Sequence, residues 1–219
     1  MNTTTKITIF IIIISSLIVM GIVTYLEKNA EWTYNNDVQI NPNIEPIQTE
    51  ITETIPVIEI SGKDFIAELT PRYNYSISAK VILRKNYYYD YPFSNISPMD
   101  LGLGWDVMTD DSILNRLDIR NSNRFLVWHS WADDLPYQEM ANCTSNVHII
   151  PATENLSKAL KKIYNRDTIY LEGYLVDVYM MDGTDIFEME TSVIRSDSGW
   201  GACEILYVKK LILDDKCYQ

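Results

Sequence analysis

The run "RSDSGWGACE", residues 195–204, holds residue types from which a nucleophilic site could be built. A cysteine attacks as the thiolate, so Cys203 needs a nearby base or an electropositive pocket. The chain has two histidines, and Cys203, His148 and Asp197 could serve as nucleophile, base and orienting acid. The glycines of the run could expose backbone N–H groups to an oxyanion. These residues form the candidate site of a cysteine-dependent hydrolase or another thiol enzyme.

Simpler structural interpretations account for the same residues. The glycines also allow a tight turn, after which Cys203 begins a strand as a small buried hydrophobe. His148 lies in the apolar run "NVHII", which is typical of a core histidine held by one hydrogen bond. Cys143 and Cys203 could instead form a disulfide, which leaves Cys217 as the odd thiol. The sequence favours these structural interpretations over catalysis and leaves them open among themselves.

Composition excludes several ligand classes. The chain carries 30 Asp and Glu residues against 18 Lys and Arg, a net charge of −12. Neutralising phosphates requires clustered basic residues, so no nucleic-acid partner is expected. The histidines and cysteines lack the spacing that places metal ligands on one face, and no acidic run matches a calcium loop. The sequence predicts neither a metal site nor a cofactor.

Aromatic residues supply the candidate binding surface. The run "NYYYDYPF", residues 86–93, places several rings in succession, so some must point outward. An exposed aromatic patch indicates a partner or ligand, although aromatic residues more often fill a core. The candidate binding residues are Tyr87, Tyr88, Tyr89, Trp105 and Trp128.

An uncharged apolar segment over residues 7–26 is predicted to cross a membrane. About 20 helical residues reach roughly 30 Å, the thickness of a bilayer core. A cleaved signal peptide would have a shorter apolar region and a small-residue cleavage site. The retained anchor is therefore the favoured prediction. Lys6 before the segment favours a cytoplasmic N-terminus, which places the remainder outside the cytoplasm.

The segments around this anchor set the expected domain organisation. Residues 1–6 are a short flank. Residues 27–61 carry prolines and repeated glutamates, which favour an extended, flexible tether. A short strand at "IPVIEI" within the tether is an alternative. Residues 62–219 are predicted to form one β-rich globular domain.

Hydrophobic periodicity predicts the elements of that domain. Alternation over residues 73–84 and 167–182 indicates long strands, and Gly173 is placed for a bend or bulge. Further strands are expected near residues 124–131, 146–150, 185–195 and 203–213. Residues 151–165 favour a helix with Thr153 as N-cap, and Ser97-Pro98 favours another helix start. The expected class is β-rich α+β, a curled antiparallel sheet or small barrel. The helix suits the third-to-fourth strand connection of an oligonucleotide-fold-like barrel.

Three stretches together resemble a known group of sequences. They are "SPMDLGLGWDVM", "SNVHIIPA", and "LEGYLVDV" followed by "DSGWGACE". The combination is similar to a group of uncharacterised bacterial proteins that pair an N-terminal hydrophobic segment with a domain bearing such runs. The resemblance covers the last two-thirds of the chain. It implies no established activity, so no catalytic residue follows from it.

Two functions remain as predictions. The favoured one is a non-enzymatic, single-pass membrane protein whose β-rich domain binds a protein or envelope component through aromatic residues. The alternative is a membrane-tethered hydrolase or thiol enzyme using Cys203, His148 and Asp197. The position of Cys203 relative to a histidine distinguishes them.

Overall fold

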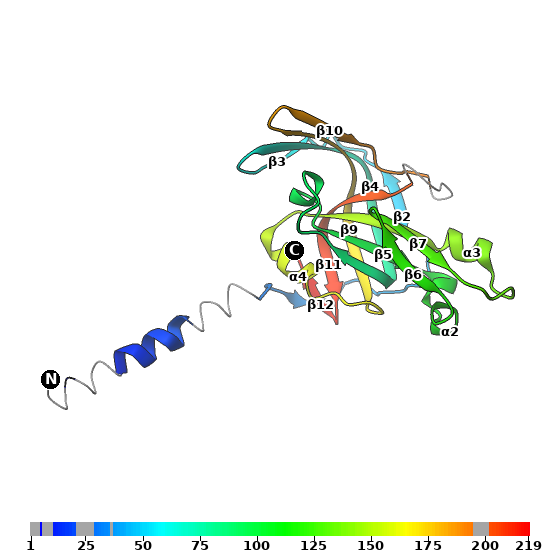
Figure 1. Cartoon of the computed structure of the whole chain (residues 1–219), viewed down its shortest axis with the longest axis horizontal. Helices are drawn as coiled ribbons and strands as arrows, with labels where there is room; N and C mark the ends of the chain where they lie inside the picture. The colour runs from blue at the N-terminus through cyan, green and yellow to red at the C-terminus, as the bar shows by residue number, and fades with distance from the viewer. Residues whose placement is uncertain (1–4, 6–10, 21–28, 36, 195–201) are drawn as a thin grey trace. The chain divides into compact units, whose positions relative to one another are not determined.

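The computed structural model describes residues 5, 11–20, 29–35, 37–194 and 202–219 (Figure 1). The chain divides into two compact units, Met1–Glu31 and Trp32–Gln219. In the first unit, residues 11–20 are helical and their side chains are exposed. Within the described ranges, no helix is both long and apolar enough to cross a membrane. Part of the anchor predicted over residues 7–26 lies outside these ranges.

The second unit is built on a ten-stranded mixed sheet that closes on itself. Along the closed path β4 pairs with β5, β5 with β8, β8 with β11, β11 with β9, and β9 with β4 again. Only the β8–β11 pairing is parallel. The strands of this ring are β4 (Phe65–Asn86), β5 (Met99–Gly104), β8 (Thr144–Pro151), β9 (Thr168–Asp182) and β11 (Glu204–Leu213).

Shorter strands extend the ring, and short helices lie in its connections. The remaining strands of the large sheet are β1 (Thr33–Tyr34), β2 (Ile47–Glu50), β3 (Ile58–Ser61), β10 (Asp185–Met189) and β12 (Lys216–Tyr218). A separate hairpin contains β6 (Asp118–Ser122) and β7 (Phe125–His129). The helical segments are η1 (Phe93–Asn95), η2 (Asp106–Thr109), α2 (Asp111–Leu114), α3 (Tyr137–Asn142) and α4 (Glu154–Leu160). The predicted β-rich α+β class is confirmed.

The N-cap predicted at Thr153 agrees with the structure. The hydroxyl of Thr153 accepts a hydrogen bond from the backbone N–H of Leu156 at 3.1 Å, which caps α4 as expected. Leu156, Ala159 and Leu160 form the buried face of this helix. Gly183 has φ of +61° in the two-residue turn between β9 and β10. A positive φ there matches the right-handed twist of the flanking strands.

β4 and β9 are long enough to contribute to two structural parts, the closed ring and an arm that extends from it. Residues 168–175 of β9 pair within the ring, whereas residues 176–182 continue with residues 65–71 of β4 as an arm that carries β3 and β10 (Figure 1). Leu175 and Val176 are both fully buried, so the buried side of β9 changes at this point. β4 has a register shift between Pro71 and Tyr73 at the same level. A one-residue shift moves all later side chains to the other face.

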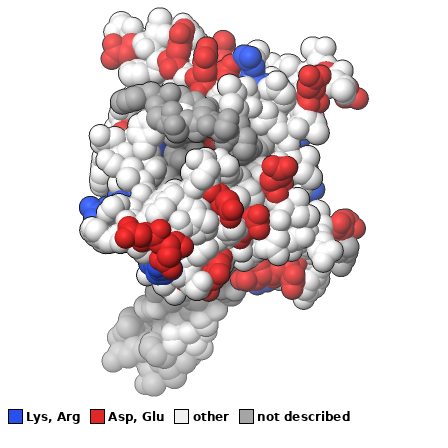
Figure 2. All heavy atoms as spheres, turned by 90° about the vertical axis from the view of Figure 1, so that its right-hand side faces the viewer, with Lys and Arg blue, Asp and Glu red and all other residues white. Residues whose placement is uncertain are grey.

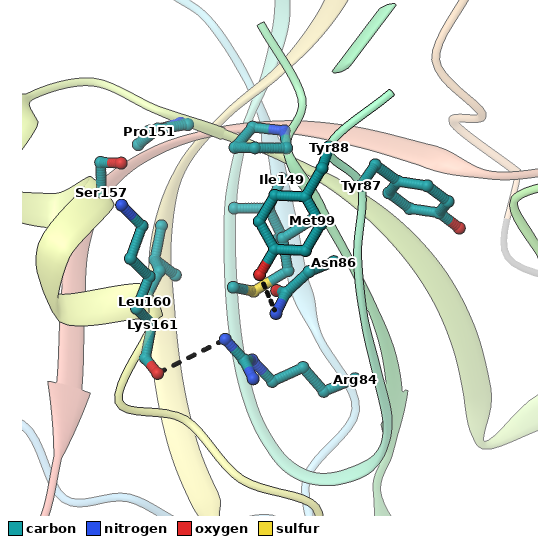
Figure 3. A pocket seen from close by; sticks show the side chains of 11 residues that line it. Arg84, Asn86, Tyr87, Tyr88, Met99, Ile149, Pro151, Ser157, Leu160 and Lys161 are labelled. Atoms are coloured by element: carbon teal, nitrogen blue, oxygen red, sulfur yellow. Dashed lines mark hydrogen bonds between the residues drawn. The ribbon is translucent and has the colours of Figure 1, made fainter. Parts of the chain in front are cut away.

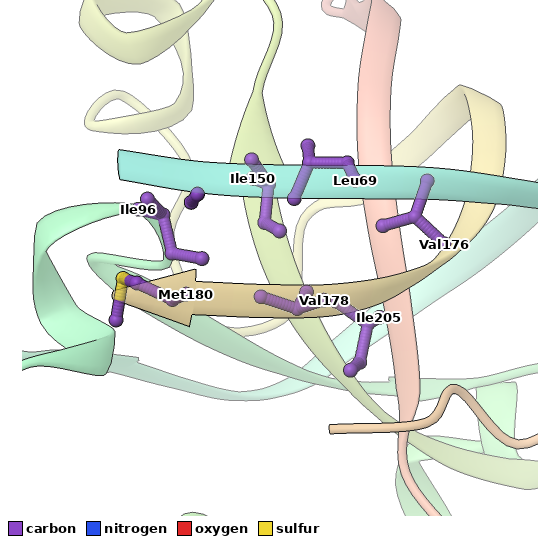
Figure 4. Packing of buried hydrophobic residues seen from close by; sticks show 8 residues of the cluster. Leu69, Ile96, Ile150, Val176, Val178, Met180 and Ile205 are labelled. Atoms are coloured by element: carbon purple, nitrogen blue, oxygen red, sulfur yellow. The ribbon is translucent and has the colours of Figure 1, made fainter. Parts of the chain in front are cut away.

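The arm therefore packs back onto the ring. Its buried residues Leu69, Val178 and Met180 contact Ile150 of β8 and Ile205 of β11 in one hydrophobic cluster (Figure 4). Burial of apolar area at about 25 cal/mol per Å² is the main stabilising contribution in such a cluster. The cluster fixes the face of β8 and β11 on which His148 also lies.

Two sequence predictions are corrected. The compact unit begins at Trp32, so β1, β2 and β3 lie in the segment predicted as a flexible tether, residues 27–61. Ile58 and Ile60 pack against the arm cluster, and this burial orders the segment. Residues 99–104, for which a helix was predicted from Ser97-Pro98, form β5 instead. All six residues of β5 are buried, and a strand buried on both faces shows no alternation in sequence.

Gly173 should be intolerant of substitution. A Cβ built there would lie 1.9 Å from the backbone oxygen of Tyr207, next to a bulge in β11. Because backbone must move, Gly173→Ala should lower the free energy of unfolding by at least about 2 kcal/mol, measured by urea denaturation.

Gly183→Ala is the matched comparison for this experiment. Nothing lies within 4 Å of a Cβ built at Gly183, so the positive φ is what opposes alanine there. The expected loss in the free energy of unfolding is about 1 kcal/mol. An equal or larger loss at Gly183 would contradict the close approach of β9 to β11.

Candidate functional site

The carboxylate of Asp100 is the centre of a buried polar network. The side chain is 1% exposed. One oxygen accepts from Nδ1 of His148 at 2.8 Å and from Arg124 Nη1 at 3.1 Å, and the other accepts from the hydroxyl of Tyr87 at 2.8 Å. A buried carboxylate is tolerated when it is paired and hydrogen-bonded. Here three donors from three different parts of the chain satisfy it.

The strand register places these groups on one face. Asp100 of β5 lies opposite His148 of β8, and His148 lies opposite Ile205 of β11. Side chains alternate between the two faces of a strand. Asn146 therefore shares the face of His148, and Cys203, which directly precedes β11, lies beside Asn146.

A strained hairpin turn brings Arg124 to the network. Asn123 and Arg124 form the two-residue turn between β6 and β7, with φ of +49° and +67°. Such values cost about 1–2 kcal/mol in a residue other than glycine. The guanidinium of Arg124 binds Asp100, Asp90 and the backbone oxygen of Ser97. These contacts offset the strain and hold the hairpin against the sheet.

Aromatic rings enclose the same cation. Arg124 lies over the ring of Tyr87 at 3.8 Å and over that of Phe93 at 4.7 Å. Phe93 also meets His148 edge to face, with ring centroids 5.5 Å apart. Cation–π contacts strengthen where water is excluded. The rings therefore keep the network dry and fix the plane of His148.

The thiol of Cys203 sits at the end of this network. Its Sγ accepts a hydrogen bond from Asn146 Nδ2 at 3.2 Å and lies within hydrogen-bonding reach of His148. Because Nδ1 of His148 donates to Asp100, the other ring nitrogen faces the thiol. Cys203 is 9% exposed. The result is an ordered series of thiol, imidazole and carboxylate, the arrangement that activates nucleophiles in acyl-transfer enzymes.

The pKa of His148 reflects this position. Burial lowers it, but the hydrogen bonds to Asp100 and Cys203 and the charges of these two groups raise it to about 9. Burial and the neighbouring Asp100 carboxylate raise the pKa of Tyr87, which therefore stays a hydroxyl donor at neutral pH. At neutral pH His148 is therefore a cation that lies beside the thiol of Cys203.

Several buried polar atoms beside the network have no hydrogen-bond partner within the described part of the chain. They are Ser97 Oγ, Asn121 Nδ2 and Asn146 Oδ1. The single hydroxyl proton of Tyr87 serves Asp100, and the amide oxygen of Asn121 lies 2.9 Å from the same hydroxyl. The nitrogen of Asn146 donates to both Cys203 and the backbone oxygen of Arg124. Native proteins rarely leave such atoms unpaired. These three atoms are the unsatisfied polar groups around the network in the described part of the chain.

The structure brings together two of the three predicted catalytic residues. Cys203 and His148 meet, whereas Asp197 lies outside the described residues. Asp100 occupies the position of the orienting acid, and sequence reasoning missed it because the run containing it was assigned to a helix. The signal was a single carboxylate inside the otherwise apolar run "PMDLGLG", since a buried charge needs a partner.

The structure places the cysteines and the tryptophan candidates in different surroundings from those predicted. Cys143, Cys203 and Cys217 are all free thiols, so the predicted Cys143–Cys203 bond is not formed. Cys143 packs against the hydrophobic cluster under the β6–β7 hairpin, together with Trp128. Trp105 is buried, at 2% exposure, which removes it from any binding surface.

The tyrosine run divides between the site and the surface. Tyr87 belongs to the Asp100 network. Tyr88 and Tyr89 are exposed.

No cluster of three or more His, Cys, Asp or Glu side chains is placed to hold a metal ion within the described ranges. Comparisons of the chain with models of protein families, with curated proteins and with solved structures found no match. The chemistry of the site must therefore be inferred from its own geometry.

Asp100→Asn should lower the pKa of His148 from about 9 toward its ordinary value of 6.5, because the charge and the hydrogen bond of the carboxylate raise it. Titration of the His148 ring by NMR measures this change. Asp111→Asn is the control, because it removes an exposed carboxylate that binds Lys80 and Arg166. This variant should leave the pKa of His148 unchanged.

The same pKa determines a pH dependence of stability. The folded-state pKa of His148 is raised, so its stabilising contribution is fully present below about pH 6.5 and is lost as the pH rises through about 9. Urea midpoints at pH 6 and pH 9.5 should differ more in the native chain than in Asp100→Asn. An equal difference would show that Asp100 does not hold His148 protonated.

Proposed function

We propose that the domain is a cysteine-dependent acyl-transfer enzyme, most simply a hydrolase, with Cys203 as nucleophile. One observation carries this proposal: Cys203 Sγ lies between the amide of Asn146 and the ring of His148, which Asp100 orients through Nδ1. A cysteine needs a base whose ring is fixed by a third group. All three groups are present here, on neighbouring strands of a rigid ring.

Each residue has a defined role in the proposed reaction. The thiolate of Cys203 attacks the acyl carbon, an S–C bond forms, and the bond to the leaving group breaks. His148 gives its proton to the leaving group and then takes one from the water that hydrolyses the thioester. Asp100 keeps the imidazole in the tautomer that faces Cys203. Arg124 and Tyr87 are positioning residues that hold Asp100.

We also propose that the ring is an oligonucleotide-fold-like barrel. Its strand order and the position of α4 between β8 and β9, the third and fourth ring strands, support this assignment. Ligands of this fold bind near strands two and three and the loops after strands one and four. Tyr87 and Ser97 lie in the first of these loops, and Cys203 ends the second. This is an analogy of fold, which supports the place of the site and not its chemistry.

The chemistry is testable with p-nitrophenyl acetate as probe. The full chain should release nitrophenolate and carry an acetyl group on Cys203, detected by peptide mass mapping. Cys203→Ser should abolish both, and His148→Gln should reduce the rate by about 100-fold, the usual contribution of a positioned base.

Cys143→Ser is the matched control and should react like the native chain. Circular dichroism of each variant checks that it folds. The proposed catalytic role would be contradicted if Cys203→Ser kept its turnover, or if Cys143 and Cys203 were acetylated equally. The network would then have a structural role.

Two observations favour a second candidate function, a membrane-anchored binding domain. Tyr88, Tyr89 and Tyr91 are 72%, 90% and 69% exposed, and they lie in the loop that borders the site. Residues 11–20 are helical and almost wholly apolar. We propose that residues 7–26 anchor the chain, with the domain outside the cytoplasm, and that the tyrosines contact a protein or envelope component. The anchor is compatible with either function.

Deletion of residues 1–31 should move the protein from the membrane to the soluble fraction of a cell lysate, because it removes the apolar segment. Immunoblotting of both fractions measures the shift. A chain that lacks only residues 1–6 serves as the control and should stay with the membrane. Recovery of the full chain in the soluble fraction would contradict the anchor.

A further inference from the structure

A pocket lies on the face of the sheet opposite His148 and Asp100. Met99 and Ile149 line it, and they alternate with Asp100 and His148 along β5 and β8. Ser157 and Leu160 of α4 form its other wall, together with Lys161, which directly follows the helix (Figure 3). Its volume is about 410 Å³, which is within the range of small-molecule sites.

The walls of this pocket are mainly apolar. They are formed by the side chains of Pro98, Met99, Ile149, Pro151 and Leu160, together with the ring of Tyr88. An occupant gains affinity here by removing apolar surface from water. The lining therefore selects a ligand with a hydrocarbon or aromatic body.

Two cations border the same apolar space. Arg84 extends into it from β4, with Nε buried and without a hydrogen-bond partner within the described part of the chain. Its Nη2 reaches only the backbone oxygen of Lys161, at 3.4 Å. The side chain of Lys161 lies along the opposite wall (Figure 3). Unlike Arg72, Arg116 and Arg166, which bind carboxylates, these two form no ion pair among the described residues.

Unpaired cations are unexpected in this protein. Its net charge is −12, and Asp and Glu side chains are numerous on the face shown in Figure 2. Two positive groups beside an apolar pocket, one of them with an unsatisfied N–H, favour an anionic ligand. A neutral ligand would leave the Nε of Arg84 unpaired, at a cost in affinity.

We propose that this pocket binds a small amphipathic carboxylate. The carboxylate lies between Arg84 and Lys161, and the apolar body lies against Met99, Ile149 and Leu160. The assignment is independent of the proposed reaction, because the pocket and Cys203 lie on opposite faces of the sheet. Tyr87 borders both places: the residue lines the pocket, its ring turns away from it (Figure 3), and its hydroxyl binds Asp100.

Octanoate is a suitable probe, with binding to the full chain in lipid nanodiscs measured by calorimetry against empty discs. Arg84→Gln and Lys161→Gln should each weaken octanoate binding by about tenfold or more, since each removes a charged hydrogen-bond donor. Lys85→Gln and Lys162→Gln, which remove neighbouring lysines outside the pocket, are the matched controls and should have no such effect. Octanol should bind the native chain more weakly than octanoate does. Octanol should bind Arg84→Gln and Lys161→Gln as tightly as it binds the native chain, because it has no charge for these cations to bind.

Three results would overturn the assignment. Equal binding of octanol and octanoate would show that the cations do not select an anion. Equal weakening by the control variants would indicate a general charge effect. Inorganic phosphate that binds as tightly as octanoate would show that the apolar walls contribute nothing. Circular dichroism of Arg84→Gln checks that the variant still folds. Because neither this check nor octanoate binding uses the Cys203 reaction, failure here is distinguishable from failure of the proposed enzyme.

Discussion

The buried carboxylate of Asp100 is the constraint on which the rest of the structure depends. A charge at this depth is stable only if donors surround it, and its donors come from the β4–β5 loop, the β6–β7 turn and β8. The same three contacts that satisfy Asp100 dock the hairpin, order the tyrosine loop and orient His148. Stability and the candidate chemistry therefore depend on the same atoms.

The two-core design explains why this charge can be held so rigidly. The ring supplies neighbouring strands in fixed register, and the arm packs Leu69, Val178 and Met180 over Ile150 and Ile205 beside His148. Packed cores do not deform continuously. The imidazole of His148 is held by its hydrogen bond to Asp100 and by its edge-to-face contact with Phe93. Preorganised polar groups of this kind stabilise developing charge without further rearrangement.

The sequence predicted the parts of the molecule whose signals are local. The cap at Thr153 and the helix that it begins lie within one short segment, residues 151–165. Cys203 and His148 were chosen by residue type alone, because their contact depends on the parallel pairing of β8 with β11, which no local pattern encodes. Asp100 was missed for the same reason. A strand buried on both faces lacks periodicity, so its one polar residue was not recognised as a site residue.

Closure of the ring has a consequence for the timing of reactivity. Cys203 directly precedes β11, and β11 is the strand that joins β8 to β9. Before this strand is in place, the thiol has neither Asn146 nor His148 beside it and behaves as an ordinary cysteine. Closure of the ring and assembly of the series Cys203, His148 and Asp100 are therefore one event. The nucleophile proposed above exists only in the closed fold, and a copy that cannot close its ring lacks it.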